Sequence, residues 1–263
     1  MGRLAHLVGM HGEEGISEDT ALALLPSFRC WVGGREVRLP HALSCLIVLV
    51  ALEDGGVGRA AVQSRLWPDS PPREAGKRLR QALWRIGRET GGRVLDVSPA
   101  HIRLAPGVET DLRRGERFAR RLSRGEADAG GRAETALLGR ELLAGWTDEA
   151  VRPTRDRWDR LRLLALERLA ERALLAGDVP GAMELAESAA RVDQIGEAPH
   201  RILAAAHLAR GDNASAWRVY ARYRDLLVTE MGLEPSRWFL DLVEELVESR
   251  RVRGMARPSP AAS

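Results

Sequence analysis

The chain has 263 residues, of which 44% are hydrophobic and 29% are charged, and its formal net charge is +3. This length is sufficient for two globular domains. The longest apolar run, residues 42–52, is about half of the roughly 20 residues that a membrane helix needs. Residues 1–15 also lack the basic-then-apolar order of a signal peptide. These features exclude a membrane-spanning or secreted class, and we expect a cytoplasmic protein that does not contact a membrane.

The first segments of the chain alternate between turns and short regular elements. We expect residues 1–17 to form a flexible leader. Residues 21–40 alternate between apolar and polar positions around Gly33–Gly34, which is typical of a β-hairpin. Two helices are predicted next, over residues 41–53 and 58–67, with a break at two glycines between them.

A third helix is predicted over residues 71–90. We expect Ser70 to cap it, with Pro71 at its first position and Gly91–Gly92 at its end. At 100° per residue, one side of this helix is apolar and consists of Ala75, Leu79, Ala82, Leu83 and Ile86. The opposite side is basic.

Positive charge is concentrated in and after this third helix. Residues 71–103 contain eight Lys/Arg and three Asp/Glu, a local balance of +5, so the rest of the chain carries 3 − 5 = −2. We expect the basic residues of this helix to lack acidic partners four positions away. This absence would distinguish the region from an ordinary solvated charged face. The imbalance predicts a phosphate-bearing partner for the N-terminal part of the chain.

A second β-hairpin is predicted over residues 93–105, with a turn at Ser98–Pro99. The order hairpin, three helices, hairpin indicates a winged helix-turn-helix domain over residues 18–110. In such a domain the third helix enters the major groove of duplex DNA and the hairpin forms a wing beside the phosphate backbone. The predicted DNA-binding residues are Arg73, Lys77, Arg78, Arg80, Gln81, Trp84, Arg85, Arg88, His101 and Arg103.

Residues 111–250 are predicted to be an all-α domain with an internal repeat. Gly177–Asp178 aligns with Gly211–Asp212 at a separation of 34 residues, which is the tetratricopeptide period. A final helix over residues 236–250 should cap the stack, with an apolar face of Trp238, Leu242, Val243 and Leu246. Residues 251–263 are predicted to be a disordered tail. The expected fold class is therefore mostly α with small β-hairpins: a winged helix-turn-helix followed by tetratricopeptide-like repeats.

No motif in the sequence indicates catalysis. The "AGKR" segment at residues 75–78 lacks the rest of a phosphate-binding loop, and His200 and His207 have no third ligand. We predict that Cys30 and Cys45 are packing thiols in a reducing compartment and not metal ligands. The expected protein is not an enzyme and needs neither a cofactor nor a metal.

Several short motifs together resemble the SARP family, the Streptomyces antibiotic regulatory proteins. They are GREVRLP, LWPD (66–69), LRQALWRIGR (79–88), LLAGW (142–146) and EMGLEPS (230–236), in this order along residues 22–247. The resemblance implies a transcriptional activator with a tetratricopeptide-like bacterial transcriptional activator domain. It also implies binding to direct repeats of double-stranded DNA near a promoter, often as a homodimer, and recruitment of RNA polymerase. Gly76 and Gly87 depart from the family pattern, each costing about 1 kcal/mol relative to Ala in a helix interior.

Two other functions are compatible with this sequence. One is a tetratricopeptide-type scaffold whose winged helix binds protein, and the other is a regulator whose helical domain senses a small molecule. The basic third helix favours the DNA-binding activator, because a scaffold would not need it. The sequence does not decide whether Trp84 faces DNA or packs against the helical domain.

Overall fold

The computed structural model describes residues 20–126 and 131–244. The predicted leader (residues 1–17), the predicted tail (residues 251–263) and Leu246 lie outside this range. The chain divides into two compact units. The first unit comprises residues 1–115 and 130–155, and the second comprises residues 116–129 and 156–263. Among the described residues, no helix has the length and hydropathy required to cross a lipid bilayer.

The first unit begins with a four-stranded sheet in the order β3-β2-β1-β7. Gly33 and Gly34 adopt φ values of +56° and +72° in the turn between β2 and β3, which confirms the predicted hairpin. The sequence did not predict β1 or its parallel partner β7, which lies far along the chain. The four strands are β1 (Thr20–Ala23), β2 (Arg29–Val32), β3 (Arg35–Glu36) and β7 (Glu109–Thr110).

Three helices follow the hairpin, as predicted: α1 (His41–Ala51), α2 (Arg59–Leu66) and α3 (Pro72–Thr90). The predicted Ser70 cap is wrong, because Pro71 is the N-cap residue and no side chain caps the helix. A residue before proline is disfavoured in the α region, so Pro71 stays extended (ψ 144°) and α3 starts at Pro72. Gly91 ends the helix at φ +60°, as predicted.

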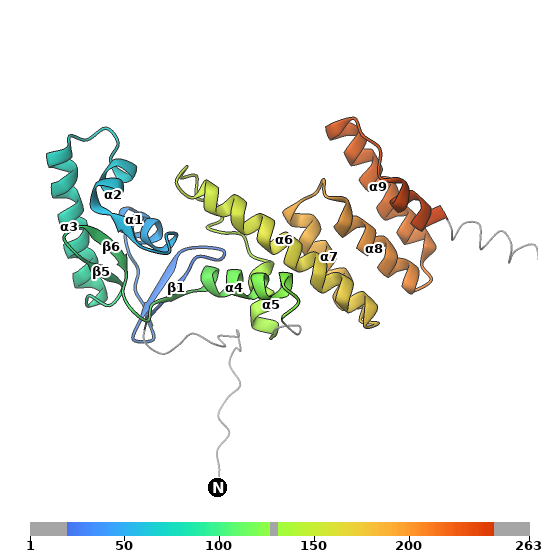
Figure 1. Cartoon of the computed structure of the whole chain (residues 1–263), viewed down its shortest axis with the longest axis horizontal. Coiled ribbons are helices and arrows are strands. Elements are labelled where there is room, and N and C mark those ends of the chain that lie inside the picture. The colour runs from blue at the N-terminus through green and yellow to red at the C-terminus, as the bar shows by residue number, and fades with distance from the viewer. Residues whose placement is uncertain (1–19, 127–130, 245–263) are drawn as a thin grey trace, which may run out of the picture. The chain divides into compact units, whose positions relative to one another are not determined.

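The wing is a three-stranded sheet in the order β4-β6-β5. It consists of β4 (Val57–Gly58), β5 (Leu95–Val97) and β6 (His101–Leu104), and the β5–β6 pair confirms the second predicted hairpin. Gly56 has φ +84°, and a Cβ at this position would lie 2.8 Å from the carbonyl oxygen of Ile102. Only glycine fits where the chain enters β4. Figure 1 shows the β5–β6 hairpin in the same unit as α1, α2 and α3.

A later segment of the chain returns to complete the first unit. It contains α5 (Arg132–Leu138) and the stretch that leads to residue 155. The Leu143 N–H donates to the Leu24 carbonyl at 2.9 Å, and the Ala144 N–H donates to the Pro26 carbonyl at 2.6 Å. Trp146 packs near Phe28, with ring centroids 6.5 Å apart. The compact first unit is therefore larger than the predicted 18–110 segment.

One half-buried carboxylate, that of Asp111, holds two distant parts of the first unit together. Asp111 accepts N–H hydrogen bonds from Leu24 (2.7 Å), Leu25 (3.1 Å) and Leu112 (2.8 Å). Burial raises the pKa of the Asp111 carboxyl, although the three N–H donors oppose that rise. These hydrogen bonds hold Leu24 and Leu25, which directly follow β1, against the first residue of α4 (Asp111–Ser123).

The Asp111→Ala substitution is expected to reduce the free energy of unfolding by about 2–4 kcal/mol, because it leaves the buried Leu24 and Leu25 N–H groups without acceptors. Urea unfolding of the full chain would measure this loss, and hydrogen exchange at residues 20–25 would locate it. The matched control is Asp54→Ala, which removes an exposed carboxylate 3.7 Å from Arg113 and should change stability little. Equal effects of the two substitutions would contradict the role of Asp111.

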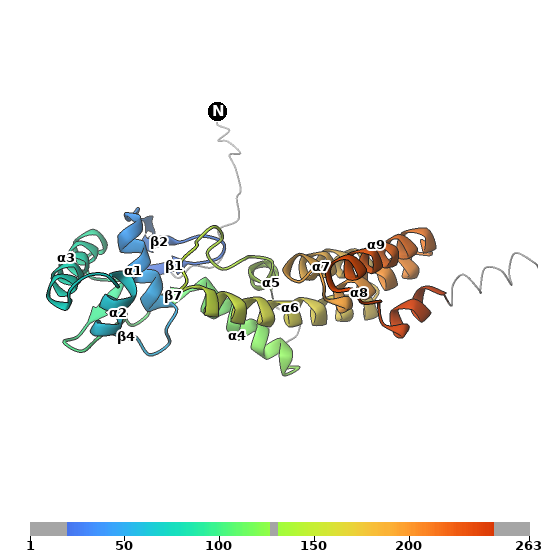
Figure 2. The same cartoon turned by 90° about the horizontal axis from the view of Figure 1, so that it is seen from above.

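The second unit contains the end of α4, most of α6 (Arg152–Leu175) and the repeat helices α7 (Val179–Val192), α8 (Glu197–Ala209) and α9 (Asn213–Met231). The buried Glu116 carboxylate accepts from Arg120 at 3.2 Å and from Arg157 at 3.1 Å, which ties α4 to α6. Figure 1 shows α7, α8 and α9 one beside the next, and Figure 2 shows the same helices from above, consistent with the extensive α7–α8 and α8–α9 contacts.

The predicted repeat is confirmed. Gly177 and Gly211 adopt φ values of +81° and +73°, and each precedes an aspartate that caps the next helix. The Asp178 side chain accepts from the Gly181 N–H, and the Asp212 side chain accepts from the Ser215 N–H, each at 3.0 Å. The aligned residues Ala182 and Ala216, Ala186 and Tyr220, and Ala189 and Tyr223 are all buried.

A helix over residues 237–244 covers the end of the repeats. The side that it buries differs in part from the predicted apolar face. Phe239 and Val243 are buried against Tyr220 and Tyr223, while Trp238 is 64% exposed. The prediction that Trp238 packs inward is therefore wrong. The Arg201 guanidinium instead lies over the exposed Trp238 ring, with its central carbon 3.8 Å from the centroid of that ring.

Candidate nucleic-acid interface

The third helix, α3, separates a buried side from an exposed side, as predicted. Ala75, Leu79, Ala82 and Ile86 are buried, and Leu83 is half-buried. Thr90 is also buried, and its hydroxyl donates to the Ile86 carbonyl at 2.7 Å. This packing fixes the helix on the unit by its apolar stripe and turns its polar residues to solvent.

The side chains of all ten predicted site residues are exposed, and all ten belong to the first unit. Eight of them lie on α3, and the other two, His101 and Arg103, lie on β6 of the wing. Gly76 and Gly87 do not interrupt α3, which is continuous from Pro72 to Thr90. The helix therefore presents an unbroken polar face.

Acidic side chains neutralise only part of this face. Arg73, Lys77, Arg80 and Arg85 form no ion pair with any residue that the structure describes. Arg78, however, pairs with Glu74 at 2.7 Å, so the expectation of no acidic partners at helical spacing is wrong. Arg88 pairs with its neighbour Glu89 at 2.8 Å. Exposed pairs of this kind contribute about 0–1 kcal/mol, so a phosphate can displace the carboxylate at little cost.

Trp84 lies on the exposed side of α3 and is 63% exposed. The Arg88 guanidinium is 5.1 Å from the centroid of its ring, within cation–π range. This contact positions Arg88 over an aromatic surface while leaving most of the indole accessible.

The wing has an internal ion pair that the sequence did not indicate. Arg103 donates from Nε (2.8 Å) and Nη2 (2.6 Å) to the Asp96 carboxylate on the facing strand. The β5–β6 register places these two residues opposite each other. Asp96 therefore partly neutralises the arginine that was predicted to contact phosphate.

Arg59 is a basic residue near the wing that the sequence analysis missed. Its backbone N–H donates to the Ala100 carbonyl at 3.1 Å, and its Nη1 donates to the Ser98 carbonyl at 3.3 Å. Both acceptors belong to the turn between β5 and β6. Because this contact joins residues about forty positions apart, no local pattern could have indicated it.

The chain thus combines a winged helix-turn-helix with tetratricopeptide-like helical repeats, the fold class that the sequence predicted. The model of the bacterial transcriptional activator domain matches residues 109–247, more than half of the chain, so the chain belongs to this family. This family match agrees with the SARP-type regulator that the sequence motifs predicted.

A solved structure supports the predicted fold class. "Mycobacterium tuberculosis EmbR in complex with low affinity phosphopeptide" aligns with 89% of this chain and 66% of that chain, with a TM-score of 0.67 and 17% identity. This chain thus spans less than two thirds of the length of the mycobacterial protein. Comparison with curated proteins found no match.

Proposed function

We propose that this activator binds promoter DNA through α3 and the wing and recruits RNA polymerase. The observation that carries the proposal is the exposed face of α3, on which Arg73, Lys77, Arg80 and Arg85 have no ion pair with the described residues. Cations on such a face displace the counterions condensed on DNA, and this displacement supplies the affinity.

The polar residues of α3 and of the wing region divide into residues that read the base sequence and residues that contact the DNA backbone. Arginine and glutamine form bidentate hydrogen bonds with guanine and adenine edges in the major groove, so Arg80 and Gln81 are assigned as base readers. Arg103, His101 and Arg59 are assigned to the phosphate backbone beside the wing. The helical repeats are assigned to polymerase contact and to head-to-tail pairing on direct DNA repeats.

The Arg80→Ala substitution is expected to cost about 1–3 kcal/mol on the cognate site and to relax preference at one base position. The Arg103→Ala substitution should weaken binding to all sequences alike. A binding-site selection with wild-type protein would define the cognate site, and fluorescence anisotropy would compare it with a scrambled duplex.

Asp96→Asn provides the matched variant for the wing, because it frees the Arg103 guanidinium from its carboxylate partner. It should strengthen binding to cognate and scrambled DNA by the same factor. If Arg80→Ala and Arg103→Ala weaken cognate and scrambled DNA equally, the division into reader and backbone contact is wrong.

A further inference from the structure

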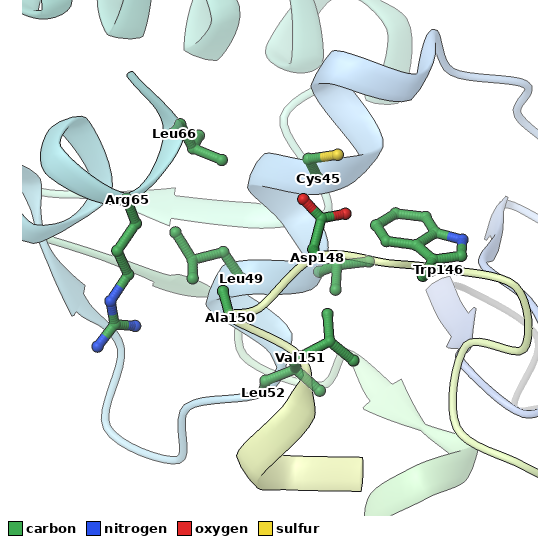
Figure 3. A pocket seen from close by; sticks show the side chains of 10 residues that line it. Cys45, Leu49, Leu52, Arg65, Leu66, Trp146, Asp148, Ala150 and Val151 are labelled. Carbon is green, nitrogen blue, oxygen red and sulfur yellow. The ribbon is translucent and has the colours of Figure 1, made fainter. Parts of the chain in front are cut away.

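Three potential metal ligands of different chemistry meet at one place in the first unit. The ligand atoms of His41, Cys45 and Asp148 all lie within 4.8 Å of one another. The Cys45 Sγ is 3.4 Å from the His41 Nε2. His41 and Cys45 lie one turn apart on α1, and Asp148 comes from the segment that returns to this unit before α6. Figure 3 shows the Asp148 carboxylate next to the Cys45 side chain.

The surroundings of the cluster support its geometry. The Trp146 ring is tilted against the His41 imidazole, with centroids 4.9 Å apart, and limits how that ring can turn. Leu49 and Val151 line the adjoining pocket, so one side of the cluster is apolar. The three ligand side chains therefore meet at the edge of an apolar pocket.

A thiolate sulfur, an imidazole nitrogen and a carboxylate oxygen are ligands that zinc accepts in proteins. An i, i+4 pair on a helix places two ligands on one face, and the third ligand here comes from another segment. This geometry departs from the prediction that Cys45 is only a packing thiol, and the spacing of His41 and Cys45 could have indicated the first half of the cluster. No sequence pattern links either residue to Asp148.

We propose that His41, Cys45 and Asp148 form a zinc site with three protein ligands and one coordination position for water or a further donor. Binding transfers the Cys45 thiol proton to solvent, and the zinc–thiolate bond replaces the S–H bond. Bound zinc would fasten residues 145–151 to α1. These residues belong to the first unit and directly precede α6, so zinc occupancy would stiffen this returning segment of the first unit. This proposal does not depend on DNA binding.

The test uses the full chain, purified without a histidine tag and titrated with Co²⁺ as a spectroscopic probe. The wild type should bind one Co²⁺ per chain with a thiolate-to-cobalt charge-transfer band, and Zn²⁺ should abolish that band by competition. The Cys45→Ser substitution should remove the band. The His41→Ala and Asp148→Ala substitutions should weaken metal affinity by more than about tenfold.

Two matched controls retain all three ligands. Glu149→Ala removes the carboxylate next in sequence to Asp148, and His207→Ala removes a histidine of the second unit. Both should bind Co²⁺ like the wild type. Circular dichroism without metal would establish that each variant is folded.

Hydrogen exchange gives a readout that needs no substitution. Adding Zn²⁺ to the wild type should slow exchange in residues 145–151, whereas Mg²⁺ should not. The proposal is overturned if the wild type gives no thiolate–cobalt band, or if the band survives Cys45→Ser. It is also overturned if Zn²⁺ leaves exchange in residues 145–151 unchanged.

Discussion

Simultaneous replacement of Arg73, Lys77 and Arg85 by alanine is expected to lower the affinity for duplex DNA about a hundredfold at ~0.15 M salt. Each phosphate contact contributes about 0.9 to the slope of log affinity against log salt concentration. The loss of three contacts should therefore make that slope less steep by up to about 2.7. Fluorescence anisotropy over a salt titration would measure both the affinity and the slope.

The matched control for this charge-removal variant is a triple alanine replacement of Arg160, Arg210 and Arg222. These exposed arginines of the second unit likewise form no ion pair with described residues. The control has the same net charge as the test variant but an intact α3, so it should bind DNA almost like the wild type. Equal losses in the two variants would mean that overall charge, and not the face of α3, determines binding. A salt-insensitive wild type would instead favour the scaffold function.

Removal of the helical repeats by ending the chain at Arg155 is expected to abolish transcriptional activation while retaining DNA binding. Linked binding modules gain about 10²–10⁴ in overall affinity through effective concentration. The truncated protein should lose this gain on DNA with two direct repeats. Gel-shift titration would measure cooperativity, and a reconstituted transcription assay would measure activation.

The truncation point follows from the structure of the first unit. A chain that ends at residue 110 lacks the Asp111 carboxylate that holds Leu24 and Leu25. It also lacks the Leu143 and Ala144 N–H groups that donate to the Leu24 and Pro26 carbonyls.

DNA with a single site is the control for this truncation, and the full and truncated chains should bind it with similar affinity. If the truncated chain still activates fully, the helical domain is a scaffold or a sensor and contributes nothing to polymerase recruitment.

Local sequence determined the parts of this protein in which neighbouring residues restrict one another. The α3 helix begins at Pro72, whose ring restricts φ to helical values. It ends at Gly91, which can adopt the positive φ of a left-handed residue. The repeat was visible because Gly177–Asp178 and Gly211–Asp212 each specify a left-handed turn followed by a capped helix. Such features depend on residues a few positions apart.

Periodicity gave the last helix but not its orientation. The sequence assigned Trp238 to the buried face, whereas Phe239 fills the space against Tyr220 and Tyr223. Two adjacent aromatic residues leave a choice of about 100° in helix rotation. Packing of Phe239 and Val243 against Tyr220 and Tyr223 of α9 settled that choice.

Tertiary structure alone decided what the charges and the distant segments do. Sequence placed Arg103 on the wing, but only the strand register paired it with Asp96. Likewise, Trp146 and Asp148 are close neighbours in the sequence, but only folding brought them to His41 and Cys45. These contacts join residues that are distant along the chain, and their formation depends on the packing of the whole unit. No local propensity encodes such a contact, because its free energy arises only when both partners are already held in place.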